Sequence, residues 1–189
     1  MAILNKKSRV VTQGDDRAAA RSMLRATGLT DEDMNKPFIG IANLASDVTP
    51  CNVHLDRIAQ KTKTGVRKSG MVPMMFGTIT ISDGISMGTE GMKASLVTRE
   101  IIADSIEAVV FGESLDGLLA VGACDKNMPG IMMAMGRLNV PSIFVYGGAI
   151  LPGNHNGEDI NVQDMFEAVG KYSRGDMTLK ELIEMEKVA

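Results

Sequence analysis

The sequence predicts an α/β protein with three layers, in which helices cover both faces of a mostly parallel sheet. Short apolar runs alternate with helical segments along residues 37–147, and this rhythm is typical of strand–helix–strand crossovers. The runs are nearly all apolar, as expected for parallel strands that are buried on both faces. Polar segments follow several of these runs, at the strand ends where open parallel sheets bind ligands.

The elements follow from the sequence in order. The first 14 residues are a polar arm, and the Ala- and Arg-rich residues 15–27 predict a helix that stops at Gly28. The expected strands are residues 37–43, 73–81, 117–122 and 141–147. The expected helices between them are residues 52–69, 95–111 and 129–138, with Pro129 suited to a first helical turn.

The periodic pattern weakens after Gly148. Residues 151–159 read as a turn-rich loop, and residues 162–172 and 179–188 as two helices. Thr178 and Glu181 have the spacing of a capping box.

Composition limits the class of protein. The 189 residues suffice for one domain with a core. A net charge of -3 gives no electrostatic reason to expect nucleic acid or an anionic membrane as a partner. No apolar run reaches transmembrane length, and the N-terminal residues lack a signal-peptide pattern. We therefore expect a cytoplasmic protein, in which two cysteines do not build a disulfide framework.

Polar side chains cluster after three of the expected strands. They are Asp47, Thr49 and Cys51 after the first strand, Asp83 and Glu90 after the second, and Cys124, Asp125 and Lys126 after the third. If the strands are neighbours, these loops converge on one rim of the sheet. Thiolates suit a soft metal or an iron–sulfur cluster, and carboxylates suit Mg²⁺. Two cysteines are too few to hold a cluster by thiolates alone.

Each of these signals also has a purely structural interpretation. A lone cysteine is more often a small buried hydrophobe than a ligand. The Asp83–Gly84 dipeptide is a frequent turn, and Asp125 with Lys126 could be a solvated charge pair. Glu90, His54 and His155 are more often surface residues than catalytic ones.

Several stretches together resemble the dihydroxy-acid/phosphogluconate dehydratase family. They are TPCN (49–52), SDGISMGTEGM (82–92), TREIIADS (98–105), CDKNMPG (124–130), IMMAMGRLNVPSIFVYGG (131–148) and NHNGEDINVQDMFEAVG (154–170). The CDKNMPG stretch is specific to this family, and the resemblance covers essentially the whole chain. The last stretch is more similar to members that act on dihydroxy acids than to those that act on sugar acids.

The resemblance implies a set of metal ligands. Cys51 and Cys124 match two of the family's three iron–sulfur ligands. Asp83 and Asp125 match magnesium ligands, and Lys126 matches the lysine that the family carbamylates so that it binds Mg²⁺ through a carbamate oxygen. The implied cofactors are an iron–sulfur cluster, with [2Fe–2S] expected rather than [4Fe–4S], and Mg²⁺.

The resemblance also implies an activity. Such a hydro-lyase converts 2,3-dihydroxy-3-methyl carboxylic acids to 2-keto acids in branched-chain (valine and isoleucine) amino-acid biosynthesis, as a homodimer. One alternative is a dehydratase of sugar acids such as an aldonate or phosphogluconate. Another is a non-catalytic interaction module that pairs with a complete subunit.

Family members are much longer than this chain. We therefore expect residues 1–189 to be the first part of the dehydratase N-terminal domain, with an incomplete sheet and without the C-terminal domain. The third cluster cysteine, a further magnesium carboxylate and the serine base would lie outside the chain. No catalytic residue is therefore assigned within it, and the isolated chain is expected to be inactive.

Overall fold

The computed structural model describes residues 4–189, which form two compact units. The first unit ends at Gly148, and the second comprises Ala149–Ala189. Chain length alone predicts one domain, whereas the structure gives the last 41 residues a fold of their own. The boundary falls where the apolar strand–helix rhythm ends.

A four-stranded sheet is the centre of the first unit. Its strands are β1 (Phe38–Asn43), β2 (Val72–Gly77), β3 (Gly117–Gly122) and β4 (Ser142–Tyr146). They are all parallel and lie in the order β2-β1-β3-β4, with Ile41 of β1 opposite Met75 on one side and Leu119 on the other. The predicted parallel sheet is confirmed, although β2 ends four residues before residue 81.

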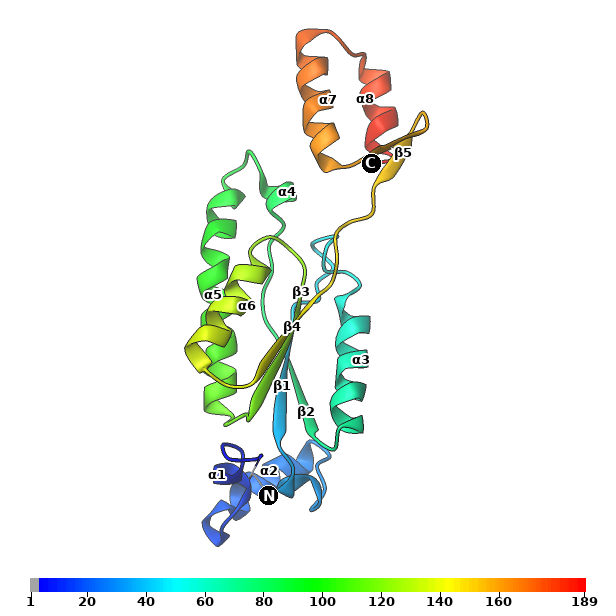
Figure 1. Ribbon diagram of the computed structural model, residues 1–189. Helices are drawn as coiled ribbons and strands as arrows, with labels where there is room; N and C mark the ends of the chain where they lie inside the picture. Colours follow the sequence, from blue (N-terminus) through cyan, green and yellow to red (C-terminus); the bar gives the residue numbers. More distant parts are fainter. Residues whose placement is uncertain (1–3) are drawn as a thin grey trace. The chain divides into compact units, whose positions relative to one another are not determined.

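Helices cover both faces of this sheet. Helix α3 (Leu55–Lys68) packs on one face, while α5 (Gly91–Gly112) and α6 (Asn127–Leu138) lie on the other (Figure 1). The core between the layers includes Ile41 and Leu118 of the sheet, and Ile102 and Ile131 of the helices, all fully buried or nearly so. The three-layer α/β/α architecture predicted from the sequence is therefore confirmed.

The segment before the sheet is more structured than a polar arm. Its elements are α1 (Arg9–Thr12), η1 (Asp15–Arg17), α2 (Ala18–Ala26) and η2 (Asp33–Asn35). The Asp116 carboxylate, just before β3, accepts hydrogen bonds from the backbone N–H groups of Lys7, Ser8 and Phe38, at 2.7, 3.2 and 2.9 Å. This carboxylate therefore ties residues of the expected polar arm to the start of β1.

The second unit contains a hairpin where a loop was expected. Strands β5 (Gly153–His155) and β6 (Glu158–Ile160) pair antiparallel. Asn156 and Gly157 connect them with positive φ angles of 54° and 88°, the backbone that an Asn-Gly dipeptide adopts in a two-residue hairpin turn. The prediction of a loop over residues 151–159 is therefore wrong, because most of these residues form the hairpin.

Two helices complete the second unit. They are α7 (Val162–Arg174) and α8 (Leu179–Glu186), which confirm both predicted helices. Reciprocal hydrogen bonds between Thr178 and Glu181 form the expected capping box, and Asn161 with Asp164 forms another at the start of α7.

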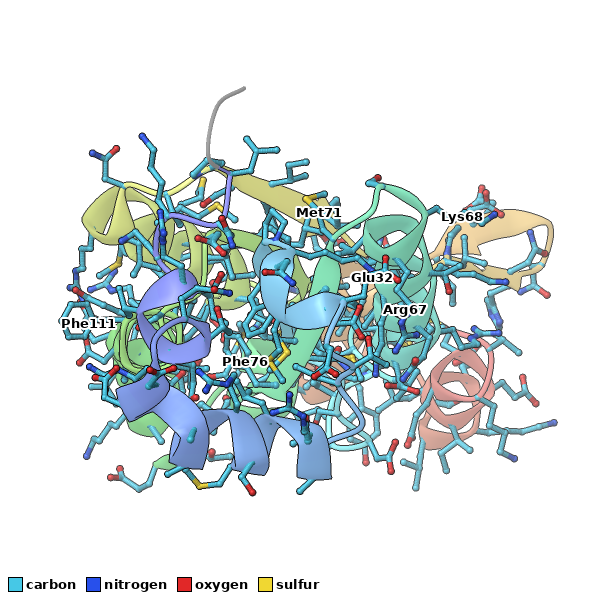
Figure 2. All side chains as sticks on the ribbon, turned by 90° about the horizontal axis from the view of Figure 1, so that it is seen from below. Glu32, Arg67, Lys68, Met71, Phe76 and Phe111 are labelled. Atoms are coloured by element: carbon cyan, nitrogen blue, oxygen red, sulfur yellow. The ribbon has the colours of Figure 1, made fainter. Side chains whose placement is uncertain are left out.

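Apolar side chains remain exposed at the sides of the first unit. Ile143 and Tyr146 on the edge strand β4 are more than half exposed, and Phe111 near the end of α5 projects into solvent (Figure 2). A cavity of about 630 Å³ lies beside the other edge strand, β2, where Met71, Phe76 and Arg67 line it. None of the five predicted site residues lines this cavity. That the sheet is incomplete stays a prediction, because every open sheet has two edge strands.

Candidate functional site

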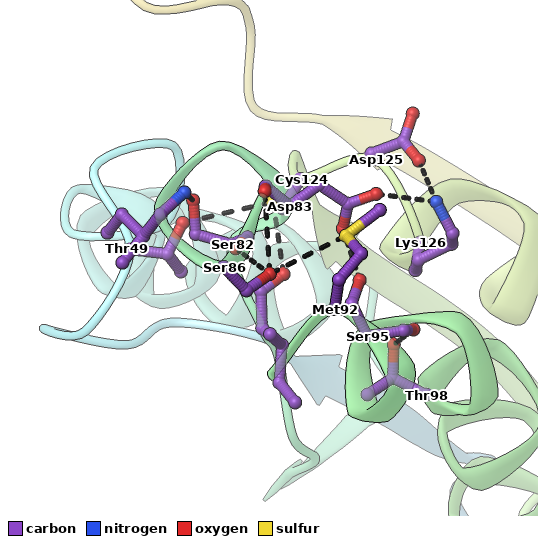
Figure 3. Close-up of polar contacts among 12 residues, drawn as sticks. Thr49, Ser82, Asp83, Ser86, Met92, Ser95, Thr98, Cys124, Asp125 and Lys126 are labelled. Carbon is purple, nitrogen blue, oxygen red and sulfur yellow. Dashed lines mark hydrogen bonds and ion pairs between the residues drawn. The ribbon is translucent and has the colours of Figure 1, made fainter. Parts of the chain in front are cut away.

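The predicted site residues lie in loops that follow β1, β2 and β3. Because these strands are parallel neighbours, the loops meet at the carboxyl edge of the sheet. Direct contacts join them: the Cys124 thiol donates a hydrogen bond to the carbonyl of Ile81 at 3.4 Å, and the Thr49 hydroxyl lies 3.8 Å from the Cys124 sulfur (Figure 3). Residues from three separate segments are therefore brought to one place.

The two cysteines are neighbours at this edge. Both are free thiols; Cys124 is buried and Cys51 is partly exposed. Burial raises the pKa of the Cys51 thiol, and the neighbouring Cys124 side chain raises this pKa further. The neighbouring Cys124 therefore disfavours ionisation of Cys51.

The second group of site residues is an acid–lysine–acid arrangement. The Lys126 ammonium donates to Asp83 Oδ2 at 2.6 Å and also forms an ion pair with Asp125 (Figure 3). The side chains of Lys126 and Asp83 are only 15% and 14% exposed, whereas that of Asp125 is 63% exposed. Carboxylates from two different loops thus converge on one positive charge.

The ionisation of this group follows from its contacts. Hydrogen bonds to Asp125 and then Asp83 raise the pKa of Lys126. Burial works to raise the pKa of Asp83, but hydrogen bonds from Lys126 and Ser95 outweigh it and lower that pKa. The arrangement in this structure is therefore an ammonium held between two carboxylates.

Sequence reasoning missed the residues that hold Asp83. The Ser82 hydroxyl accepts from the N–H of Ile85 and caps a short helix, α4 (Asp83–Ser86), where only a turn was expected. Ser95, fully buried in α5, donates its hydroxyl to Asp83 Oδ1 (Figure 3). One carboxylate oxygen therefore faces Ser95 and the other faces Lys126. No sequence pattern singled out Ser95, which was expected as the first residue of a helix; α5 begins four residues earlier and so places Ser95 in its second turn.

Other residues that drew attention in the sequence lie outside this group. Glu90 is exposed and pairs with Lys93. His54 Nε2 lies 2.7 Å from the carbonyl oxygen of Gly147, which joins the start of α3 to the end of β4. His155 belongs to β5 in the second unit. Within residues 4–189, no three His, Cys, Asp or Glu side chains gather closely enough to hold a metal ion by themselves.

No helix among residues 4–189 combines the length and the apolar character needed to cross a membrane.

Comparisons with known proteins place this sequence in a family. Residues 36–189 match the family model described as dihydroxy-acid/6-phosphogluconate dehydratase N-terminal. A dihydroxy-acid dehydratase of Synechococcus sp. (strain JA-3-3Ab) is 60% identical over 183 residues, which is 97% of this chain and 32% of the relative. The dihydroxy-acid dehydratase of Acaryochloris marina is 58% identical over 185 residues, or 98% of this chain and 33% of the relative.

The chain therefore spans about a third of the length of these curated relatives. The matched region includes β1 to α8 and every predicted site residue. On the strength of this match over most of its length, the chain belongs to the dihydroxy-acid/6-phosphogluconate dehydratase N-terminal family.

Proposed function

We propose that the chain is the N-terminal part of a dihydroxy-acid dehydratase of branched-chain amino-acid biosynthesis. The whole enzyme would remove water from a 2,3-dihydroxy-3-methyl carboxylic acid and leave a 2-keto acid. The observation that supports this most directly is the meeting of two thiols and an acid–lysine–acid group at one edge of the sheet. The relatives named dihydroxy-acid dehydratase point to the same reaction.

The thiol pair suits an iron–sulfur cluster. Cys51 and Cys124 come from different loops and face each other, and their proton loss would be driven by metal binding. Two thiolates do not complete the ligand set of a cluster. In the proposal, the remaining cysteine belongs to the two thirds of the relatives' length that this chain does not cover. A [2Fe–2S] cluster is the form we favour.

The acid–lysine–acid group suits Mg²⁺. Asp83 and Asp125 already direct carboxylate oxygens to one positive charge, and hard oxygen ligands are those that Mg²⁺ prefers. Carbamylation of Lys126 would replace this ammonium by an anionic oxygen ligand. Carbamylation needs a neutral amine, and the two ion pairs that raise the pKa of Lys126 oppose the loss of its proton while no metal replaces the ammonium. Metal and carbamate therefore belong together in the proposal.

The proposed cluster and the proposed Mg²⁺ would have different roles in the reaction. When bound, the cluster would supply a Lewis acid for departure of the C3 hydroxyl, and Mg²⁺ would stabilise the negative charge that develops on the substrate carboxylate and C2 oxygen. This chain's own residues would bind and orient these groups. Thr49 fixes the sulfur of Cys124, and Ser95 fixes the carboxylate of Asp83. The base that removes the C2 proton would come from outside residues 1–189.

Variants of the intact protein test the assignment of ligands. Cys124→Ser should lower bound iron while Mg²⁺ is retained, and Asp83→Asn should lower Mg²⁺ affinity by more than about tenfold while iron is retained. Glu90→Gln is the matched control, because Glu90 is an exposed acid in the same loop. Loss of both metals in Glu90→Gln, or of neither in the other two variants, would contradict the assignment.

Steady-state assays test the reaction. The intact protein should turn over a 2,3-dihydroxy-3-methyl acid faster than an aldonate or phosphogluconate; the reverse preference would assign it to sugar acids. The isolated 189-residue chain should show no turnover with either, since it contains only part of each proposed metal site. The homodimer and the cytoplasmic location stay predictions, which sedimentation and fractionation can test.

A further inference from the structure

A buried amide is hydrogen-bonded to the backbone of Cys124 and to Asn52, the residue that follows Cys51. Asn127, the first residue of α6, is fully buried. Its Oδ1 atom accepts hydrogen bonds from the backbone N–H groups of Cys124 at 3.1 Å and Ala123 at 3.4 Å. These hydrogen bonds join the start of α6 to Ala123 and Cys124, the two residues that follow β3, and so hold the backbone that carries the Cys124 side chain.

The same amide also reaches the other two loops. Asn52, next to Cys51, is fully buried and donates from Nδ2 to Asn127 Oδ1 at 2.8 Å and to the carbonyl of Leu44 at 2.5 Å. Asn127 Nδ2 in turn donates to Thr80 Oγ1 at 3.0 Å, in the segment that follows β2. One side chain therefore links the loops after β1, β2 and β3.

Packing of α6 on the sheet does not by itself explain why a polar side chain is buried at position 127. A buried polar group costs free energy unless it is hydrogen-bonded, so an apolar side chain would be cheaper in a helix that only packed on the sheet. The Oδ1 atom of Asn52 has no partner among residues 4–189. Asn52 is therefore oriented through its Nδ2 bonds, one of which depends on Asn127.

We propose that Asn127 is a positioning residue that sets the separation and direction of Cys51 and Cys124 before they bind metal. It acts on Cys124 through the N–H groups of residues 123 and 124, and on Cys51 through Asn52. The inference rests on the proposed function only for the identity of the metal group. The preorganisation of the two thiols is a property of this chain and can be measured without metal.

Labelling of thiols in the metal-free intact protein measures this preorganisation. The rates at which iodoacetamide modifies Cys51 and Cys124 are followed separately by mass spectrometry of their peptides. In Asn127→Leu, which keeps the side-chain size but removes every amide bond, the Cys124 rate should rise about three- to tenfold, the effect of losing a net hydrogen bond or more. Ala134→Gly is the control, because Ala134 is fully buried in the same helix and the change weakens that helix without touching the loops.

A second pair of variants changes Thr80, which accepts the hydrogen bond from Asn127 Nδ2. Thr80→Val removes the hydroxyl that accepts from Asn127, whereas Thr80→Ser keeps it. The Cys124 rate should rise in Thr80→Val and stay near the wild-type rate in Thr80→Ser. This pair decides the question even where Asn127→Leu fails to fold, and equal rates in the two Thr80 variants would overturn the inference.

Iron binding provides the second measurement. After anaerobic reconstitution, Asn127→Leu should hold less iron than Ala134→Gly and show an altered visible absorption band. A change in the Cys124 labelling rate of less than about twofold in Asn127→Leu, or an equal rise in Ala134→Gly, would overturn the inference. Absence of iron in the wild-type protein would instead refute the proposed function, and the labelling rates would still decide the role of Asn127.

Discussion

Replacement of Gly130 by alanine tests how α6, and with it the CDKNMPG loop, is placed. A Cβ atom at Gly130 would lie 2.8 Å from the carbonyl oxygen of Arg99, 2.9 Å from Ile102 Cβ and 3.0 Å from Ile102 Cγ2. These atoms belong to the backbone or the branch point of α5, so they cannot move away without shifting the helix. Overpacking of this kind costs about 1–3 kcal/mol.

Gly136 gives a control in the same helix. A Cβ atom there meets nothing within 4 Å, so Gly136→Ala should gain the helix propensity of alanine, about 1 kcal/mol. The propensity gain is common to both variants, and the difference between them therefore isolates the contact with α5. We expect Gly130→Ala to be less stable than Gly136→Ala by about 1–3 kcal/mol.

Urea unfolding followed by far-ultraviolet circular dichroism measures this difference. The slope with denaturant should be the same for both variants, so that the midpoints compare stability directly. If the two variants agree within about 0.5 kcal/mol, the close approach of α5 and α6 at Gly130 is wrong. Since α6 begins at Asn127, the placement of residues 124–126 just before this helix would then be wrong as well.

Three other predictions follow from local contacts. Asp116→Ala should destabilise the first unit by about 2 kcal/mol in urea unfolding, because the N–H of Phe38 and two others lose a charged acceptor; an unchanged midpoint would contradict this anchor. Gly157→Ala should cost about 1 kcal/mol through its φ of 88° and speed amide exchange in the hairpin, whereas equal exchange rates would argue against the turn. Hydrogen bonding to the backbone of Thr178 lowers the pKa of Glu181, so the stability it gives α8 is present above the unfolded pKa and is lost as pH falls through the folded pKa. The protection factors of the α8 amides, which are corrected for the intrinsic exchange rate at each pH, should therefore fall on acidification, and in Glu181→Gln they should not.

The order and type of the main elements could be predicted because burial leaves a strong pattern. Residues 117–122 are apolar on both faces and form a central strand, as β3 has neighbours on each side. The hairpin at residues 153–160 was missed because its strands have three residues each and no apolar alternation. There the signal was the Asn156–Gly157 dipeptide alone, which turn chemistry recognises and periodicity does not.

In the candidate site, too, some features could be predicted from the sequence and others could not. The convergence of Cys51, Asp83 and Cys124 could be expected, because the ends of neighbouring parallel strands share an edge. The residues that hold them could not. Ser95 and Asn127 lie inside helices, where serine and asparagine carry no distinctive pattern, and only the packing of those helices on the loops reveals their hydrogen bonds.

The structure explains why a thiol, a carboxylate and an amine stand side by side after β3. Cys124 remains within the layer of the sheet, where its N–H is bonded to Asn127 and its sulfur is buried beside the loop from β1. Asp125 is the first residue to reach solvent, and Lys126 returns toward Asp83 as the chain turns into α6. Consecutive side chains thus leave the strand in different directions. A change in the start of α6 would therefore move both groups together, so Asn127→Leu should disturb the Lys126–Asp83 pair as well as the thiols, whereas Ser95→Ala should loosen Asp83 and leave the Cys124 labelling rate unchanged.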